Sequence, residues 1–100
     1  MKNFKLVIKS NAQLDLKENI NWYNQQKKGL GKTFYAYVKK KAKQLQNYPY
    51  SAENRYLDIR TAVIEKFPYM LHYIVDYNNK TIIILAVLHT SKNPDTHYIK

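Results

Sequence analysis

Residues 67–98, FPYMLHYIVDYNNKTIIILAVLHTSKNPDTHY, decide the fold that this chain can adopt. Tyr69 to Tyr77 and Thr81 to Leu88 are rich in Ile, Val, Leu and Tyr, which favour β-strands. The pair Asn78-Asn79 between them can supply the positive φ angles of a tight hairpin turn. The stretch therefore predicts a β-hairpin.

The second strand of this hairpin is apolar on both faces. Alternation places Ile82, Ile84, Ala86 and Leu88 on one face and Ile83, Leu85 and Val87 on the other. This pattern predicts a central strand that is covered on each side. A polar cluster follows at once: His89, Ser91, Lys92, Asn93, Asp95, His97 and Tyr98. Such a cluster at a strand end is typical of a functional site, although strand ends are polar in ordinary domains too.

The first half of the chain predicts one strand and two helices. Lys2 to Lys9 alternates like a half-buried strand, and Ser10 with Gln13 forms a plausible capping box for a helix. Gly29-Leu30-Gly31 breaks the helical pattern, and a second helix is expected from about Thr33 to Asn47. The apolar stripes of the two helices are Ala12, Leu16, Ile20 and Tyr23, and Phe34, Val38, Ala42 and Leu45. So short a loop predicts an antiparallel helical hairpin.

The remainder of the chain is strand-like. Tyr56 to Arg60 and Ala62 to Phe67 predict short strands with a turn near Thr61. The element order β-α-α-β-β-β-β predicts an α+β fold over a single domain, residues 1–100. In this fold the helical hairpin packs on a twisted, mainly antiparallel sheet of four to five strands.

The net charge of +10 is unevenly distributed along the chain. Residues 1–50 hold eleven lysines against Asp15 and Glu18, whereas residues 51–100 hold six basic and five acidic groups. A strongly basic half points to nucleic acid or an acidic protein as partner. A solvated lysine face that maintains solubility explains the charge equally well. Lys32, Lys39 and Lys43 lie off the apolar stripe of the second helix, so we expect them to point outward as nucleic-acid or partner contacts.

The composition also bears on compartment and cofactors. The chain has no cysteine, so it lacks disulfides and thiolate metal sites, which fits a reducing cytoplasm. The first ten residues show no signal-peptide core, and the longest apolar run, residues 82–88, is too short to span a bilayer. We expect a cytoplasmic protein with no membrane contact. No metal-ligand spacing and no phosphate-binding glycine-rich motif is found, so no metal and no small-molecule cofactor is expected.

Several segments together resemble the RelE/ParE superfamily of toxins, of the plasmid-stabilisation type. They are Asp15-Leu16, Trp22-Tyr23, Gly29-Leu30-Gly31 with Phe34, Pro49, Ile59-Arg60, Phe67-Pro68-Tyr69 leading into Tyr73, and Ala86-Val87-x-His89-x-x-Lys92-x-Pro94. The resemblance covers nearly the whole chain. It implies the toxin of a bacterial type II toxin–antitoxin module, neutralised by a cognate antitoxin, with the same order of elements as the periodicity predicts.

The resemblance leaves the mechanism open. One branch of the superfamily cleaves mRNA on the ribosome, and another inhibits DNA gyrase without a known nuclease site. Metal-free RNA cleavage needs a base, cations for the phosphate and an acid. The resemblance implies Arg60, Lys66, His89, Lys92 and Tyr98 as the catalytic candidates of a metal-independent endoribonuclease. Lys92 stands where the family usually has arginine, and a lysine clamps phosphate less well than the planar guanidinium does.

Each candidate has a structural alternative. Arg60 could form an ion pair with a neighbouring carboxylate, and His89 could bond the backbone at the strand end. His72 is expected to pack within the sheet. Three hypotheses therefore stand: a ribosome-dependent mRNA endonuclease, a non-enzymatic gyrase inhibitor, and a basic nucleic-acid-binding module.

Overall fold

The computed structural model describes residues 4–91 and shows two helices and one five-stranded sheet. The elements in chain order are β1 (Lys5–Ile8), α1 (Ser10–Gln26), α2 (Leu30–Asn47), β2 (Glu53–Tyr56), β3 (Ile59–Val63), β4 (Tyr69–Asp76) and β5 (Thr81–His89). This order confirms the predicted α+β fold. No helix within residues 4–91 combines the length and the hydropathy that crossing a bilayer requires.

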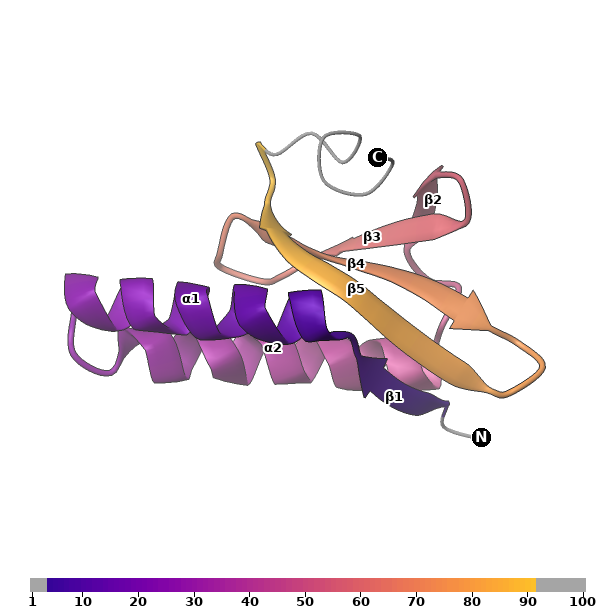
Figure 1. Cartoon of the computed structure of the whole chain (residues 1–100), viewed down its shortest axis with the longest axis horizontal. Helices are drawn as coiled ribbons and strands as arrows, with labels where there is room; N and C mark the ends of the chain where they lie inside the picture. Colours follow the sequence, from indigo (N-terminus) through magenta and orange to yellow (C-terminus); the bar gives the residue numbers. More distant parts are fainter. Residues whose placement is uncertain (1–3, 92–100) are drawn as a thin grey trace.

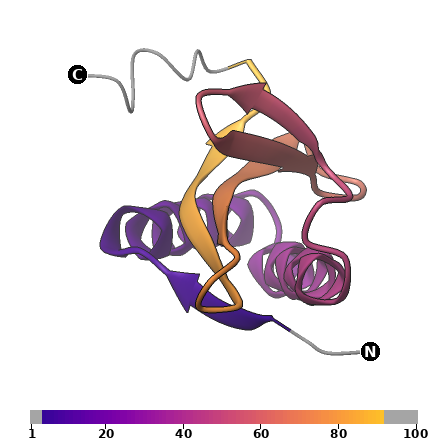
Figure 2. The ribbon, with the colours of Figure 1, turned by 90° about the vertical axis from the view of Figure 1, so that its right-hand side faces the viewer.

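The sheet has the strand order β1-β5-β4-β3-β2. β1 pairs with β5 in parallel, and the three other pairings are antiparallel. The two helices run antiparallel to each other and cover one face of the sheet (Figure 1). Seen nearly along their axes, the helices lie at the level of β4 and β5, with β1 below them and β2 and β3 above them (Figure 2). The predicted helical hairpin and mainly antiparallel sheet are therefore confirmed.

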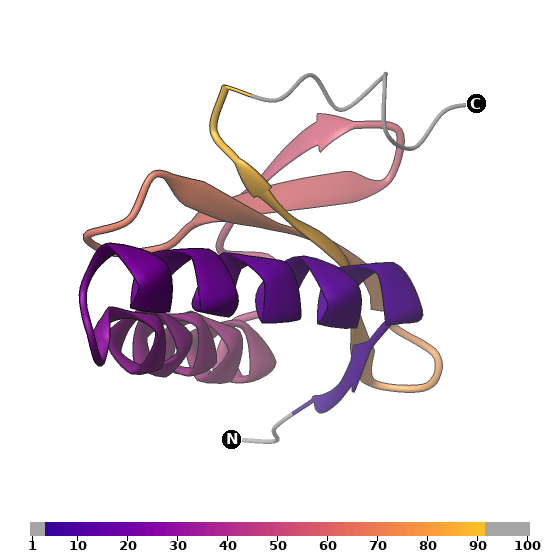
Figure 3. The ribbon, with the colours of Figure 1, turned by 60° about the vertical axis from the view of Figure 1, so that its left-hand side comes forward.

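The helices bury the stripes that the sequence predicts. α1 buries Ala12, Leu16 and Tyr23, with Ile20 partly covered, and α2 buries Phe34, Val38, Ala42 and Leu45. α1 crosses and packs against β5 (Figure 3). Opposite the helices, the sheet contributes Leu71, Tyr73, Ile82, Ile84 and Val87 to the same core. One layer of helix therefore packs on one layer of sheet, as burial of two apolar stripes requires.

An aromatic cluster fastens the β3–β4 turn to the helical hairpin. The rings of Tyr23 and Phe34 lie 5.1 Å apart, and each lies 5.1 Å from the ring of Phe67. Tyr69 packs on both helices, 6.1 Å from Tyr23 and 5.3 Å from Phe34. Burial raises the pKa of the Tyr23 and Tyr69 hydroxyls. Phe67 and Tyr69 of the motif Phe67-Pro68-Tyr69 thus pack against the core, whereas Pro68 is exposed.

The loop between the helices is tighter than predicted. Gly29 adopts the left-handed conformation, with φ 85°, and α2 begins at Leu30 instead of Thr33. Gly31 therefore lies inside the helix, where its N–H donates to Asn24 Oδ1 at 2.8 Å. A Cβ at Gly31 would overlap the Ile20 carbonyl oxygen, so this glycine lets the two helices approach each other.

Two local predictions were wrong, one for a helix cap and one for a hairpin turn. Lys9 is the N-cap of α1 and makes no side-chain cap, and the Gln13 amide instead donates to the Ile8 carbonyl at 2.8 Å. In the β4–β5 turn the positive φ belongs to Lys80, not to either asparagine. Asn79 stabilises that turn through its amide groups, which donate to the Asp76 carboxylate and lower its pKa.

The strand boundaries and faces also differ from the prediction. The turn between β2 and β3 lies at Leu57-Asp58, where Leu57 has φ 50°, so Thr61 lies within β3. In the β4–β5 register His72 pairs with Ala86 and Tyr73 with Ile84, which skips Leu85. Such a bulge moves each side chain after it in β5 to the face of the sheet opposite the one that simple alternation predicts. Val87 therefore joins Ile82 and Ile84 in the core, and Ala86 and Leu88 lie on the opposite face.

Candidate functional site

Arg60 points to the helix-covered side of the sheet. It lies on β3 opposite Tyr73, a core residue, and residues directly opposite each other share a face. Its Nη1 donates to the Ala52 carbonyl at 2.6 Å, and its guanidinium carbon lies 4.9 Å from the centre of the Tyr50 ring. The partly buried guanidinium thus holds the segment that leads from α2 into β2. The structure gives Arg60 these partners rather than the ion pair that was the alternative.

Lys66 lies in the turn between β3 and β4. It is exposed, has φ 70°, and its Nζ lies 5.6 Å from the centre of the Tyr37 ring on α2. Its neighbour Glu65 forms an ion pair with Lys40 at 3.1 Å. Lys66 therefore belongs to the contact between this turn and α2.

His89 ends β5 beside α1. Its Nδ1 lies 3.1 Å from the Ser91 N–H and 2.9 Å from the Ser91 hydroxyl, and its ring packs edge-on against Tyr69 at 5.3 Å. Because the backbone N–H can only donate, Nδ1 is the acceptor, and a neutral His89 carries its proton on Nε2. This interaction matches the strand-end hydrogen bond to the backbone that was the alternative to catalysis.

A polar hollow of about 260 Å³ lies next to His89. Besides His89 and Tyr69, its lining includes Asp15, Glu18 and Asn19 of α1. Asp15 belongs to a segment that carries the family resemblance, but the sequence predicted no functional role for any of these α1 side chains. The signal was present, because Asp15 and Glu18 are the only carboxylates in the first fifty residues and stand one helical turn apart.

The structure does not bring the described catalytic candidates together. Arg60 lies opposite Tyr73, and His89 lies opposite Tyr69, on the other side of β4. Four residues of strand separate these two tyrosines, about 13 Å along β4. Lys66 lies in a turn against α2. Lys92 and Tyr98 lie outside the described residues.

The face of the sheet away from the helices is mostly apolar. Ile59, Val63, Met70, Ala86 and Leu88 belong to it by register. His72 is fully buried there, and its Nδ1 lies 3.0 Å from the Tyr56 hydroxyl, so the prediction that His72 packs within the sheet is confirmed. Within residues 4–91, no three His, Asp or Glu side chains approach closely enough to hold a metal ion.

The charge is sharply divided between helix and sheet. Residues 53–91 carry four basic and four acidic side chains, and α1 carries Lys17 against Asp15 and Glu18. α2 carries five lysines and no carboxylate. Lys32, Lys39 and Lys43 are exposed, as the sequence predicts. Strands β2 to β5 are therefore electrically neutral, and most of the positive charge comes from α2 and the loop before it, with Lys5 and Lys9 at β1 adding two charges.

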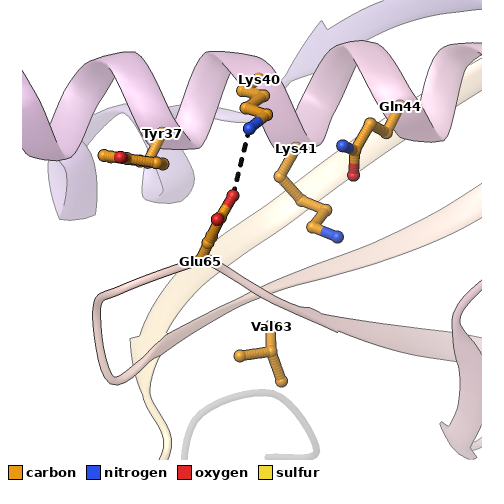
Figure 4. A pocket seen from close by; sticks show the side chains of 6 residues that line it. All are labelled: Tyr37, Lys40, Lys41, Gln44, Val63 and Glu65. Carbon is orange, nitrogen blue, oxygen red and sulfur yellow. Dashed lines mark hydrogen bonds and ion pairs between the residues drawn. The ribbon is translucent and has the colours of Figure 1, made fainter.

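A groove runs between α2 and β3 (Figure 4). It consists of two adjoining hollows, of about 250 Å³ and 560 Å³, which share Lys41, Gln44 and Val63. The Lys40–Glu65 ion pair bridges one end, and Lys41 extends into the space beside it (Figure 4). Val63 and Tyr48 are each 58% exposed. The ladder between β2 and β3 ends at the Glu53–Thr61 pair, so Val63 has no partner on β2. The groove thus places the cations of α2 beside the open edge of β3, where the Val63 side chain points away from α2.

Comparison with known proteins places these features in a family. Residues 6–94 match the family model described as the ParE toxin of the type II toxin–antitoxin system parDE. The fold is similar to a solved chain of the chromosomal ParDE toxin–antitoxin system from P. aeruginosa, with a TM-score of 0.75, 19% identity, and coverage of 86% of this chain and 95% of that one. It is also similar to a chain of the RelBE2 toxin–antitoxin complex from Mycobacterium tuberculosis, with a TM-score of 0.65, 20% identity, and coverage of 87% and 98%. No curated protein sequence matches the chain.

Proposed function

Because the chain belongs to the ParE toxin family of type II toxin–antitoxin systems, we propose that it arrests growth by binding and inhibiting DNA gyrase, not by cleaving mRNA. The observation that supports this choice is the separation of Arg60, Lys66 and His89. The superfamily includes both activities, so the chemistry available at the site must distinguish them.

Metal-free RNA cleavage requires a base, an acid and cations that all reach one phosphate. Here the guanidinium of Arg60 is occupied by Ala52 and Tyr50. The strand position of Arg60, opposite Tyr73, is about 13 Å along β4 from Tyr69, which lies opposite His89. Strands β2 to β5, which carry Arg60 and His89, add no excess of cations that would attract an RNA strand. A toxin that acts by binding needs no such convergence, which favours inhibition of a protein target.

The similar solved chains come from toxin–antitoxin systems, and we propose that a cognate antitoxin neutralises this toxin in the α2–β3 groove. The open edge of β3 at Val63, the exposed Tyr48 and the cations Lys40 and Lys41 fit a segment with apolar and acidic side chains. Acidic segments that are disordered when free cover such grooves as they fold.

The groove proposal has a matched pair of variants. Val63→Arg places a bulky cation at the open edge of β3 and is expected to weaken antitoxin binding at least tenfold. Leu57→Arg makes the same change at a site that is 70% exposed and outside the groove, and is expected to bind antitoxin like the unchanged toxin. Equal affinity of both variants in calorimetric titration would place the antitoxin elsewhere.

The target is tested with purified toxin in two parallel assays. One measures supercoiling of relaxed plasmid by gyrase, and the other follows intact mRNA on translating ribosomes. We expect supercoiling to fall at equimolar toxin and mRNA to stay intact. Cleaved mRNA together with unaffected supercoiling would reject gyrase inhibition in favour of the endonuclease.

A further inference from the structure

The positive charge of the described chain is concentrated in one segment. Residues 27–43 contain seven lysines and no carboxylate, whereas residues 4–91 as a whole have a net charge of +8. These seven lysines are Lys27, Lys28, Lys32, Lys39, Lys40, Lys41 and Lys43. Any polyanion that this protein meets is therefore attracted first to α2 and the loop before it.

Three of these lysines form a regular row on α2. Lys32, Lys39 and Lys43 are spaced by seven and four residues, so they lie on one helix face. At the rise of an α-helix the row is about 16 Å long. All three are exposed, and so are Lys27 and Lys28 in the loop that precedes the helix. We call this set of five lysines the α2 lysine row.

The α2 lysine row has little charge compensation within the protein. Among residues 4–91 the only ion pair joins Lys40 to Glu65, and neither residue belongs to the row. Like charges one turn apart, as at Lys39 and Lys43, repel each other. The field of the row is therefore directed to solvent, where an external anion would relieve this repulsion.

We propose that the α2 lysine row binds the phosphate backbone of nucleic acid without sequence preference. Its length matches several successive phosphates along a strand, each of which pairs with one ammonium group. Tyr35, 39% exposed with Lys39 Nζ 4.9 Å from its ring centre, adds an aromatic contact beside the row. It is the only exposed large hydrophobic side chain on the described α2.

This scarcity of apolar side chains favours nucleic acid over an acidic protein. Stable protein interfaces depend on buried aromatic or aliphatic anchors, whereas nucleic-acid backbones are held largely by cations. The inference concerns the row alone and does not rest on gyrase as the target. Phosphate binding by the row would let the toxin contact nucleic acid that is bound to its target.

The test compares two triple variants that lose the same charge. Lys32→Gln/Lys39→Gln/Lys43→Gln removes the centre of the row, and Lys5→Gln/Lys9→Gln/Lys17→Gln removes three exposed lysines outside it. Fluorescence anisotropy measures binding to labelled duplexes of roughly 20 base pairs, one of DNA and one of RNA, over a range of salt concentrations. Circular dichroism first checks that both variants fold.

We expect the unchanged toxin to bind with a strong salt dependence. The row variant should lose at least tenfold in affinity near 0.1 M salt, and the slope of log K against log salt should flatten by about 2.7 units for DNA. The control variant should lose no more than about threefold, through its lower net charge. Comparison of the affinities for the two duplexes shows whether the row prefers DNA or RNA.

Three results would overturn the proposal. They are no salt-dependent binding to either duplex, equal losses in the two variants, and displacement of the duplex by polyglutamate at matched charge concentration. The last result would assign the row to an acidic protein. None of these measurements contains gyrase, so their failure leaves the proposed target untouched.

Discussion

The Oδ2 atom of Asp15 on α1 accepts a hydrogen bond from the backbone N–H of Val87 on β5, at 3.0 Å. β1 ends at Ile8, opposite Ile84, so the later part of β5 has no strand on that side within the described residues. The carboxylate takes the place of the missing strand and satisfies a backbone donor that would otherwise be costly to bury. It joins residues 72 positions apart in the sequence.

Loss of this carboxylate should destabilise the fold. Asp15→Ala is expected to lower the free energy of unfolding by about 1.5–3 kcal/mol, because a charged acceptor is removed from a partly buried donor. Asp15→Asn keeps an acceptor oxygen and should cost less. Urea-induced unfolding measures both, with the exposed Glu18→Ala as the control. An Asp15→Ala protein as stable as the control would show that the bond contributes nothing.

The two glycines of the helical hairpin should respond differently to asparagine. Gly29→Asn should cost only a few tenths of a kcal/mol, since asparagine tolerates the left-handed conformation and no atom lies within 4 Å of the added Cβ. Gly31→Asn should cost about 1–3 kcal/mol, because its Cβ would overlap the Ile20 carbonyl. Thermal unfolding of both variants checks the difference, and the opposite ranking would contradict this packing.

Arg60 should behave as a structural residue. Arg60→Gln removes the hydrogen bond to Ala52 and the stacking on Tyr50, and is expected to lower the free energy of unfolding by about 1–2 kcal/mol. Arg55→Gln is the matched control, because Arg55 is exposed and its contact with Thr61 Oγ1 is long, at 3.4 Å. It should change stability by less than about 0.5 kcal/mol. Similar losses in both variants would argue against the anchoring role of Arg60.

Stability should fall at alkaline pH. Burial raises the pKa of Tyr23, Tyr69 and Tyr73 above the ordinary value of 10.0, so the folded state holds these phenolic protons more tightly than the unfolded state does. Their contribution is fully present below pH 10.0 and is lost as the pH rises through the folded pKa values. Melting temperatures measured across that range should drop, and Tyr69→Phe should reduce the drop. A profile that is the same for Tyr69→Phe and the unchanged protein would refute the assignment to Tyr69.

Helical periodicity predicted the parts of the fold that depend on local pattern. The stripes on α1 and α2 and the interior position of β5 in the sheet follow from which side chains are apolar, although helices cover β5 on one face only and not on both as predicted. The bulge at Leu85 was not predictable from local sequence. It occurs on β5 where the pairing with β1 ends, and that position depends on how the two strands pair in the folded chain. The turn at Leu57-Asp58 lacks glycine, proline and asparagine, and Asp58 alone is too weak a turn signal to locate it.

The candidate site was less predictable than the fold. The sequence indicated Arg60 and His89 as residue types suited to phosphate chemistry, but their separation depends on strand register. The partners of Arg60, at Tyr50 and Ala52, lie between α2 and β2, where no helical or strand periodicity predicts the path of the chain. Phe67-Pro68-Tyr69, which helped to identify the family from sequence, contributes two rings to the core.

The most direct test of the central claim is growth arrest by a toxin that lacks the predicted cleavage chemistry. The quadruple variant Lys66→Gln/His89→Gln/Lys92→Gln/Tyr98→Phe leaves the anchoring Arg60 in place. Expressed without antitoxin, and at a level matched to the unchanged toxin by immunoblot, it is predicted to arrest growth to the same extent. Full recovery of growth by a folded variant would contradict a mechanism based on binding. It would indicate that the protein cleaves mRNA, as one branch of the superfamily does.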